Sequence, residues 1–380
     1  MRWSVVCAAG VLSVACRQAE PPVRVLDGLR ITPDVVRHAA LPTDLTFVEE
    51  DLRRALPPAQ AAPLDALLRE CLEASGGRAV SAAVYLPGAG VWAGACSRDA
   101  QLQVDPDTRF HAASITKAMT AALVLQLVEE GRFTLDTAVE RWFPGLPRGA
   151  EITVDHLLSH TSGLTDPALG VPDTARSFRA AAEVLASMQR GEVAFAPGTR
   201  WSYCNAGYQL LGEIVARECG APFAEVMEQR LWRPLGLARA CYVTSANQRE
   251  VLPDSVVGGS SGFDVIDYAV PLAAGAVAAT PRDLVRWHAA LLGSAVLRPD
   301  TAARMLDRLL PMSPGSMWWG RGLMLLRMPD PIGEVIYSAG GIQGFQSALA
   351  WLPTKRAFVA VMTIDETPAG PFLWRLANAL

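Results

Sequence analysis

Strand-like segments lie near both ends of this chain, and a long helical and loop-rich region separates them. Residues 79–86 and 90–96 are apolar and joined by a short turn containing proline and glycine, which is typical of a β-hairpin. Further strand-like segments follow after residue 318 and end at 357–364. Such segments bury their apolar faces by pairing in a common sheet. The pattern therefore predicts an α+β fold, with an antiparallel sheet built from both chain ends, flanked by helices, and a helical insertion domain.

Three helix signals lie between and beside these strands. Residues 64–75 are amphipathic and end before two glycines, and residues 114–130 carry apolar side chains at helical spacing. Thr280 is expected to cap a third helix, with Pro281 at its first position and Asp283 at its third. These signals predict where helices begin and end.

The composition suits one large domain or two closely packed ones. Of 380 residues, 51% are hydrophobic and 19% are charged, which is enough apolar material for a large core. The net charge is −4 and the sequence has no basic run, so we expect no nucleic-acid partner.

Changes in pattern along the chain divide it into three parts. Residues 1–16 form a targeting segment. Residues 17–62 carry scattered prolines and no sustained period, so they are interpreted as a tether with a short helix near 47–56. Residues 63–380 form the folded region, whose α/β part spans about 63–135 and 270–380 and whose helical part spans about 136–269.

The targeting segment has one positive charge before an apolar run that ends at Ala15, next to Cys16. This run is too short to span a membrane and is typical of a signal peptide. The ending Ser-Val-Ala-Cys resembles a bacterial lipobox, although leucine is usual at the position of Ser13. We therefore expect lipidation of Cys16 in the cell envelope of a bacterium, with this lipid anchor as the only membrane contact. An ordinary signal peptide and an unprocessed N-terminus are the alternatives.

Five cysteines remain after the targeting segment, and export would permit disulfides. Cys71–Cys96 and Cys219–Cys241 are the local pairings, which would leave Cys204 as a thiol. The alternative is five unpaired and mostly buried thiols.

Ser114 and Lys117 lie three residues apart where a helix begins, so their side chains share a helix face. A serine hydroxyl needs a base to become a nucleophile, and a lysine serves as that base when burial lowers its pKa. Only two of the 34 basic residues are lysines, and arginine does not deprotonate in proteins. The scarcity of lysine favours a catalytic pair. The alternative is a helix-capping serine beside a surface lysine.

A second group of polar residues precedes another helix. In an extended segment, Tyr203 and Asn205 point to one side and Cys204 to the other. Tyr203 could share proton transfer with Lys117, and Asn205 could bind Lys117 and a substrate amide. In the alternative interpretation, Tyr203 is a core aromatic residue and Asn205 is a helix N-cap.

With Ser-Ile-Thr-Lys at 114–117 followed by Tyr-Cys-Asn at 203–205, the chain resembles the serine β-lactamase and penicillin-binding-protein superfamily. It is most similar to the class C β-lactamase-related branch, which includes esterases and D-amino-acid peptidases. The resemblance runs from about residue 63 to 380 and is carried by the segments 110–147, 152–164, 197–215, 275–292 and 339–353. It implies a β-lactamase-like α+β fold.

The resemblance also implies residue roles. Ser114 would be the acylated nucleophile, Lys117 and Tyr203 the proton-transfer pair, and Asn205 would orient Lys117 and the substrate. The third motif of the family, usually Lys-Thr-Gly or His-Thr-Gly, aligns with Ser338-Ala339-Gly340. The oxyanion hole would use the backbone amides of Ser114 and Gly341.

The third motif departs from the family pattern because Ser338 carries no charge and Ala339 no hydroxyl. The usual Lys or His helps bind a substrate carboxylate, so efficient β-lactam hydrolysis is less expected than hydrolysis of a neutral ester or amide. Arg321 is a candidate for meeting a substrate anion, because its strand should neighbour the third motif. The alternative is a solvated strand arginine.

His156 and His160 are four residues apart, a spacing that can bind a metal on a helix. No glutamate accompanies them as in the HExxH motif, and the resemblance implies a structural segment near the site. Neither a metal nor another cofactor is expected.

These observations predict an exported serine hydrolase that forms an acyl-enzyme on Ser114 and hydrolyses a small ester, amide or peptide. The alternative is a catalytically weak homologue that recognises penicillin and binds a cell-wall peptide or a protein partner. The altered third motif and the proline-rich segment motivate this alternative.

Overall fold

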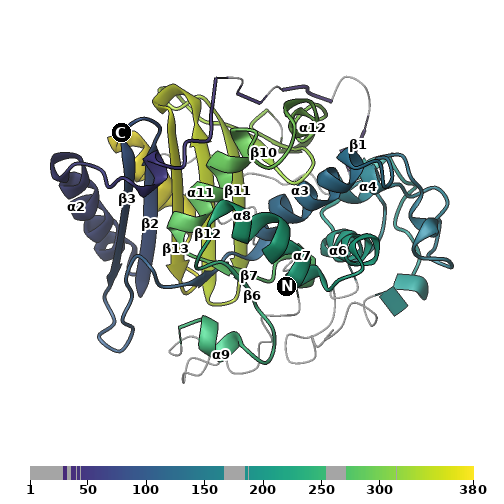
Figure 1. Ribbon diagram of the computed structural model, residues 1–380, viewed down its shortest axis with the longest axis horizontal. Coiled ribbons are helices and arrows are strands. Elements are labelled where there is room, and N and C mark those ends of the chain that lie inside the picture. Colours follow the sequence, from purple (N-terminus) through teal and green to yellow (C-terminus); the bar gives the residue numbers. More distant parts are fainter. Residues whose placement is uncertain are drawn as a thin grey trace.

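The computed structural model describes residues 29–31, 36–39, 41–42, 44–166, 185–186, 188–253, 271–313 and 315–380. Its largest element is an eight-stranded sheet with the strand order β3-β2-β13-β12-β11-β10-β9-β8 (Figure 1). Every neighbouring pair is antiparallel. The strands are β2 (Ala79–Leu86), β3 (Gly90–Ser97), β8 (Leu310–Ser313), β9 (Met317–Trp319), β10 (Met324–Arg327), β11 (Glu334–Ile342), β12 (Phe345–Leu352) and β13 (Ala357–Ile364).

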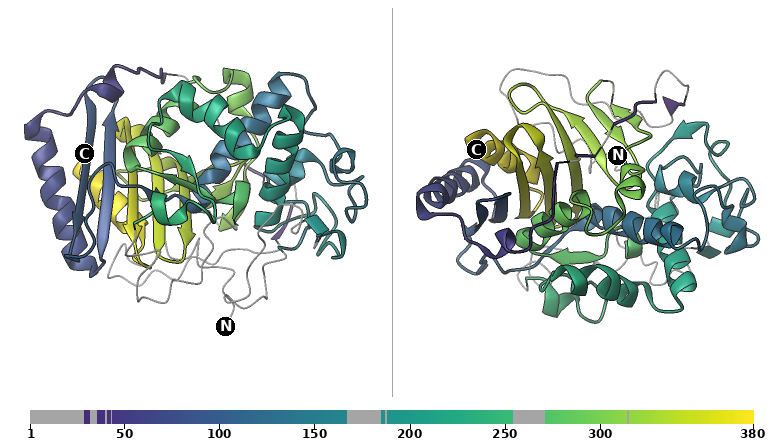
Figure 2. Two further views of the ribbon diagram at one scale, coloured as in Figure 1. Left: turned by 60° about the horizontal axis from the view of Figure 1, so that its bottom comes forward. Right: turned by 45° about the horizontal axis from the view of Figure 1, so that its top comes forward.

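The two ends of the chain meet at the junction of β2 and β13, where Ala82 pairs with Val361. Both strands are almost wholly buried, because helices cover both faces of the sheet. The helices α2 (Pro58–Ser75) and α13 (Ala369–Ala379) lie on one face, and α11 (Pro281–Leu292) packs on the other (Figures 1 and 2). The prediction of an α+β fold with a sheet built from both chain ends is confirmed.

The remaining helices and a small second sheet complete the described structure. In that sheet β7 (Val277–Ala279) pairs with both β4 (Phe110–His111) and β6 (Cys241–Tyr242), so it ties the chain before Ser114 to the chain that returns from the helical part. The helices are α3 (Thr116–Glu129), α4 (Val154–Leu158), α6 (Asn205–Cys219), α7 (Phe223–Met227), α8 (Arg233–Leu235), α9 (Gln248–Val251) and α12 (Pro299–Ala303). Single turns are η2 (Asp51–Arg53), η3 (Ala113–Ile115), η4 (Val139–Arg141), η6 (Glu228–Trp232), η7 (Leu272–Ala274) and η8 (Pro353–Lys355).

The predicted helix ends follow from their capping residues. The Thr280 hydroxyl accepts a hydrogen bond from the Asp283 amide, and the Asp283 carboxylate accepts one from the Thr280 amide. Helix α2 ends where Gly76 adopts a left-handed conformation with φ of 73°, but it begins at Pro58, earlier than the amphipathic pattern indicated. The helix expected near 47–56 is only the turn η2.

The tether prediction is wrong for the described residues between 29 and 62. The short strand β1 (Leu29–Arg30) pairs with β5 (Arg200–Trp201), and Ala55 forms a parallel bridge with Val91. Arg37 forms an ion pair with Glu334 at 2.6 Å. The scattered prolines prevent regular periodicity but still allow short backbone pairings with the folded region. Residues 1–28, which include Cys16, lie outside the described residues.

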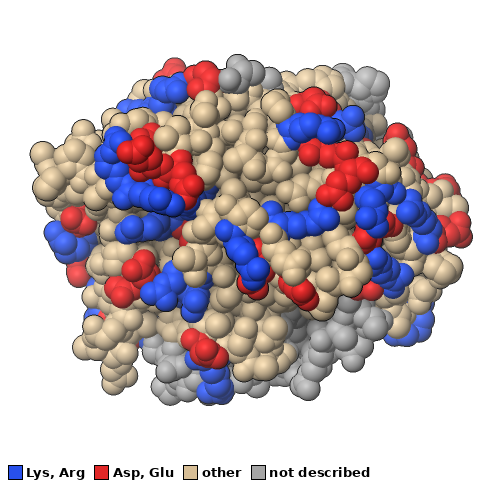
Figure 3. Space-filling model, in the orientation of Figure 1, with Lys and Arg blue, Asp and Glu red and all other residues tan. Residues whose placement is uncertain are grey.

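The five cysteines of the described chain are unpaired thiols, so the structure contains neither of the predicted disulfide pairs. It matches the alternative in the lack of pairing but not in burial, because only Cys71 and Cys204 are buried. Burial raises the pKa of Cys96 to about 11 and that of Cys204 to about 12. No helix among the described residues is long and apolar enough to cross a membrane. On the face shown in Figure 3, acidic and basic side chains are interspersed. Ion pairs between exposed side chains, such as Arg233–Glu228 at 2.9 Å, occur in the described structure.

His288 is expected to make the fold sensitive to acid. Its side chain is fully buried beside Phe358, and neither ring nitrogen has a hydrogen-bond partner among the described residues. Burial lowers its pKa from 6.5 to about 3. The unfolded chain therefore binds more protons than the folded one between these values, and stability falls as the pH falls through this window.

We predict that His288→Leu changes the free energy of unfolding little at pH 8 but raises it by about 2 kcal/mol relative to the unsubstituted protein at pH 5. Urea denaturation of both proteins at the two pH values measures this difference. An effect of equal size at both pH values would mean that packing, and not protonation of this imidazole, sets the change.

Candidate active site

Ser114 lies in the turn η3, directly before the helix α3. The residue before it, Ala113, has a φ of 47°, a conformation that costs energy for a residue with a Cβ atom. Hydrogen bonds hold the backbone there: the Ala112 amide donates to Val277 at 2.8 Å, and the Ser347 hydroxyl donates to the Ala112 carbonyl at 2.8 Å. The two sheets thus present the Ser114 side chain, which is partly exposed, at the start of a helix.

Lys117 is fully buried one helical turn beyond Ser114. Its Nζ donates hydrogen bonds to Ser114 Oγ at 3.1 Å, to Asn205 Oδ1 at 2.8 Å and to the Ala274 carbonyl at 2.8 Å. These three acceptors are uncharged. Loss of one proton from Nζ would leave two donors for Asn205 and Ala274 and a lone pair facing Ser114. The contacts therefore suit a base that acts on the Ser114 hydroxyl.

Tyr203 is the second side chain that contacts the Ser114 hydroxyl. Its hydroxyl donates to Ser114 Oγ at 2.8 Å, and Lys117 Nζ lies 4.8 Å from the centre of its ring. Cys204 points into the core, so Tyr203 and Asn205 share one side as predicted. Asn205 is the first residue of α6 and not its N-cap, which is Cys204.

The third motif lies on β11, against the turn that carries Ser114. A Cβ atom added to Gly340 would lie 2.8 Å from the Ser114 amide nitrogen and would collide with the Ala112 carbonyl oxygen. Ser338 is two residues earlier and shares this face of the sheet. It is buried, and its Oγ has no hydrogen-bond partner in the part of the chain that the structure describes. The strand continues through Gly341, whose amide is one of the two predicted oxyanion donors.

A comparison with families of known proteins agrees with this geometry. The family model described as Beta-lactamase matches residues 64–379. The chain belongs to the beta-lactamase family. The match spans the chain from helix α2 to the C-terminal helix α13.

Three proteins of known name illustrate what the chain is similar to. Esterase EstB from Burkholderia gladioli is 34% identical over 178 residues, which cover 42% of this chain and 45% of the esterase. Penicillin-binding protein 4 from Amycolatopsis lactamdurans is 32% identical over 302 residues, or 71% of this chain and 76% of that protein. The crystal structure of D-amino acid amidase from Ochrobactrum anthropi SV3, complexed with D-phenylalanine, has a TM-score of 0.74 and 26% identity. It covers 84% of this chain and 99% of the amidase.

As a member of the beta-lactamase family, the chain is a serine hydrolase. It belongs to the β-lactamase and penicillin-binding-protein superfamily, in the branch of esterases and D-amino-acid peptidases. The resemblance on which the sequence prediction rested is therefore confirmed. The roles of the individual site residues remain predictions that the geometry supports.

The prediction that Arg321 meets a substrate anion is contradicted by its contacts. Arg321 lies between β9 and β10 and is 7% exposed, so it is not a solvated strand arginine either. Its guanidinium donates to Asp155 at 2.5 Å and also contacts Asp307 and the Arg304 carbonyl. Carboxylates of the protein therefore already neutralise this guanidinium. Because Asp155 belongs to α4, the contact also joins α4 to the segment between β9 and β10.

His156 and His160 do not share a helix face, because α4 ends at Leu158 and His160 has a φ of 58°. His156 belongs to the N-terminal cap of α4, where its Nδ1 accepts a hydrogen bond from the Thr153 amide at 3.2 Å. His160 is buried beside Tyr203, with ring centres 4.4 Å apart. The structure therefore places the His160 ring directly beside the predicted proton-transfer residue Tyr203.

The sequence reasoning missed two contributors to the site. The Ala274 carbonyl binds Lys117, and the Asp166 carboxylate accepts a hydrogen bond from the Asn205 amide at 3.2 Å. A backbone carbonyl leaves no mark in the residue pattern. The N-cap of α6 is Cys204, whose side chain makes no capping hydrogen bond. The one signal for Asp166 was therefore that this helix needs an acceptor from an acidic residue elsewhere in the chain.

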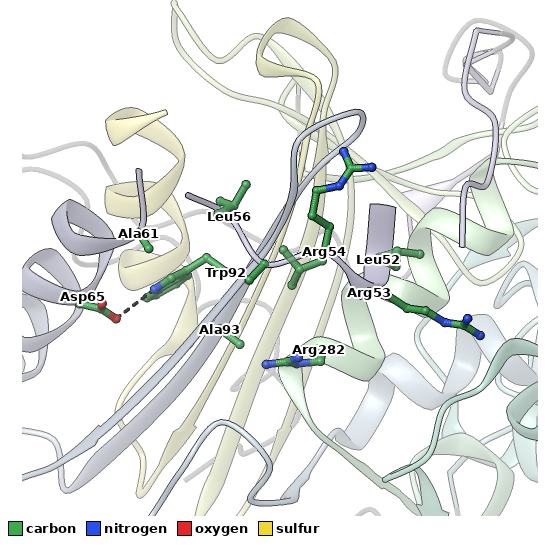
Figure 4. Close-up of a pocket in the computed structure, with 11 residues that line it drawn as sticks. Leu52, Arg53, Arg54, Leu56, Ala61, Asp65, Trp92, Ala93 and Arg282 are labelled. Atoms are coloured by element: carbon green, nitrogen blue, oxygen red, sulfur yellow. Dashed lines mark hydrogen bonds between the residues drawn. The ribbon is translucent and has the colours of Figure 1, made fainter. Parts of the chain in front are cut away.

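A separate pocket of about 300 Å³ lies at the outer edge of the sheet, between α2, β3 and the start of α11 (Figure 4). Trp92 forms part of its wall and donates a hydrogen bond to Asp65 at 2.9 Å. Arg53 and Arg54 border it and are each paired with a neighbouring carboxylate. None of the site residues lines this pocket, so the candidate active site rests on the geometry around Ser114.

Gly340 gives a direct test of the contact between β11 and the Ser114 turn. In Gly340→Ala the new methyl group would meet backbone atoms of Ala112 and Ser114 and would push the strand away from the turn. We expect kcat/KM to fall by about 100-fold or more, because both predicted oxyanion amides would shift. Steady-state hydrolysis of a chromogenic ester measures this loss.

The matched control is Gly207→Ala on α6, where the nearest atom to the added Cβ lies at an ordinary 3.6 Å. This variant should keep nearly full activity. Equal activity of both variants would show that the strand does not need to lie so close to Ser114.

Proposed function

We propose that this serine hydrolase cleaves an uncharged ester or amide through an acyl-enzyme on Ser114. The observation that carries the proposal is the double contact of Ser114 Oγ, which lies 3.1 Å from Lys117 Nζ and 2.8 Å from the Tyr203 hydroxyl. A nucleophile with two proton-transfer groups in hydrogen-bonding distance is the arrangement that covalent catalysis requires.

In the first half-reaction Ser114 Oγ attacks the substrate carbonyl carbon, and its proton passes to Lys117 or Tyr203. The amides of Ser114 and Gly341 stabilise the negative charge that develops on the carbonyl oxygen. Collapse of the tetrahedral intermediate breaks the bond to the leaving group, which takes up the proton. In the second half-reaction a water molecule attacks the acyl-enzyme, loses a proton to the same groups, and releases a carboxylic acid and free Ser114.

The environment of the third motif supports an uncharged substrate. Ser338 stands where the family usually has a cation, and its buried hydroxyl has no partner among the described residues. An uncharged hydroxyl at this position can donate at most one neutral hydrogen bond to a substrate. Arg321 cannot replace the missing charge, because it is bound to Asp155 and Asp307. A substrate carboxylate would therefore be desolvated here without a compensating charge.

The names of two relatives agree with this class of substrate. One is an esterase and another is a D-amino acid amidase. Both an ester and a primary amide present an uncharged group where a peptide substrate of a carboxypeptidase presents a carboxylate.

The test has two parts. Purified protein is first treated with a fluorophosphonate, and mass spectrometry should locate one adduct on the peptide that contains Ser114. Turnover is then measured with p-nitrophenyl esters, nitrocefin, and a D-alanyl dipeptide supplied both as the free acid and as its amide. We expect the amide to be cleaved with a kcat/KM at least about tenfold above that of the acid, which matches one lost charged contact.

Two outcomes would count against the proposal. A folded protein with neither adduct nor turnover would be a weak binding homologue and not a hydrolase. Preferred cleavage of the free acid would retain the hydrolase but would overturn the uncharged substrate.

We also propose that the chain is exported and carries a lipid on Cys16, in keeping with its apolar N-terminal run. In a bacterial host, Cys16→Ala should move the protein from the membrane fraction to the soluble fraction of the cell envelope. Immunoblots of the fractions measure this shift. If the substituted protein stays in the membrane fraction, the lipid anchor is wrong.

A further inference from the structure

His160 contacts the chain on both sides of Tyr203. Its carbonyl oxygen accepts a hydrogen bond from the Ser202 amide at 2.9 Å, and its ring Nδ1 accepts one from the Cys204 amide at 3.2 Å. Its ring also lies against the Tyr203 ring, with centres 4.4 Å apart. A single residue therefore binds both neighbours of the predicted proton-transfer tyrosine and supports its aromatic face.

The turn that carries His160 is itself held firmly. The Leu158 carbonyl accepts hydrogen bonds from the Tyr208 hydroxyl at 2.8 Å and from Trp319 Nε1 at 3.1 Å. His160 has a φ of 58°, a conformation in which histidine and asparagine are more frequent than most residues. Contacts from α6 and β9 thus fix the turn that in turn binds the Tyr203 segment.

The imidazole of His160 is neutral in this arrangement. Because Nδ1 accepts a hydrogen bond, the ring proton must be on Nε2, which is buried and has no hydrogen-bond partner among the described residues. Burial holds the pKa of His160 well below its usual range, and the charge of Lys117 acts in the same direction. A neutral ring places no second positive charge near Lys117, and the lone pair of its Nδ1 is already used by the Cys204 amide.

The Tyr203 segment depends on such support because it belongs to no helix or strand. It lies between the end of β5 at Trp201 and the start of α6 at Asn205. Its hydroxyl must nevertheless remain 2.8 Å from Ser114 Oγ, and a displacement of about 1 Å at a reacting group can cost about 100-fold in rate.

We infer that His160 is a positioning residue, which fixes Tyr203 against Ser114 by accepting the Cys204 amide hydrogen bond on its ring. This inference deepens the proposed function and rests on it for the catalytic consequence. The hydrogen bond itself is independent of that function and can be tested separately.

The test uses two substitutions that separate the acceptor from the ring. His160→Asn keeps an acceptor near the position of Nδ1 and suits the left-handed backbone, whereas His160→Phe keeps an aromatic ring and loses the acceptor. We expect His160→Phe to lower kcat for a p-nitrophenyl ester by about 100-fold with KM changed less than about threefold. His160→Asn should retain kcat within about fivefold of the unsubstituted enzyme.

The structural readout is exchange of the Cys204 amide. The chain has seven cysteines, so selective ¹⁵N-cysteine labelling gives few resonances, and Cys204→Ser identifies the one required. The Cys204 amide should lose protection in His160→Phe and keep it in His160→Asn, while the other cysteine amides remain unchanged. Thermal unfolding verifies that both variants are folded.

The outcomes separate this inference from the proposed function. If the unsubstituted protein forms no fluorophosphonate adduct and has no activity, the proposed function is wrong. Exchange of the Cys204 amide would still decide the role of His160. Unchanged protection of Cys204 in His160→Phe would overturn the inference. If the unsubstituted enzyme is active, the inference would also be wrong if His160→Phe kept full activity. It would be wrong as well if His160→Asn lost more activity than His160→Phe.

Discussion

Ser114→Ala is expected to lose the fluorophosphonate adduct and to lower kcat/KM for an ester by at least about 10⁴-fold. The reason is that the Ser114 hydroxyl lies within hydrogen-bonding distance of both Lys117 Nζ, at 3.1 Å, and the Tyr203 hydroxyl, at 2.8 Å. Removal of Oγ leaves both proton-transfer groups without a nucleophile to act on. Mass spectrometry of the intact protein and steady-state kinetics measure the two losses.

Ser97→Ala is the matched control, since Ser97 is exposed at the far end of the edge strand β3. It should keep both the adduct and full turnover. If Ser114→Ala instead keeps turnover, the acyl-enzyme mechanism is wrong and a directly activated water molecule must replace it.

Lys117→Arg is expected to lower kcat/KM by at least about 10³-fold although it keeps the positive charge. The proposed mechanism requires Lys117 to accept a proton from Ser114, and arginine does not lose a proton in proteins. The Nζ position is also defined by three short contacts, with Ser114, Asn205 and Ala274, which the planar guanidinium cannot reproduce together. Pre-steady-state release of p-nitrophenol should show that acylation is the step that slows.

The control for this substitution is Lys355→Arg, because Lys355 is the other lysine of the chain and lies in the turn η8, far from Ser114 in the sequence. It should leave activity unchanged. A thermal melt of Lys117→Arg separates lost chemistry from a disturbed core, because Lys117 is fully buried. Persistent activity in a folded Lys117→Arg protein would show that a proton acceptor other than Lys117 serves Ser114.

Much of the fold was predictable because it depends on local patterns. The hairpin at 79–97 and the cap at Thr280 follow from turn chemistry and from capping residues that act within a few positions. The proline-rich segment misled the prediction, because its pairings with Val91 and with the strand β5 are made to distant residues. A lack of periodicity excludes a regular element but does not exclude packing.

Site residues could be predicted from the sequence only where a residue type is rare in it or follows a recognisable spacing. A lysine among so many arginines marks Lys117, and the alternation of side chains in an extended segment places Tyr203 and Asn205 on one side. Arg321 shows the limit of this reasoning. The strand β10 that follows it does pair with β11, but Arg321 lies before that strand and its side chain binds Asp155 and Asp307.

The sequence by itself indicated the candidate nucleophile, the candidate base beside it, and the sheet formed from both chain ends, because residue type and short-range spacing set these features. Only the tertiary structure decided which groups surround Ser114 and Tyr203. The Ala274 carbonyl, the close approach of Gly340 and the two hydrogen bonds that His160 accepts involve segments between about 40 and 230 residues away. Such contacts depend on how packed elements bring backbone atoms together, and backbone atoms are the same in every residue type.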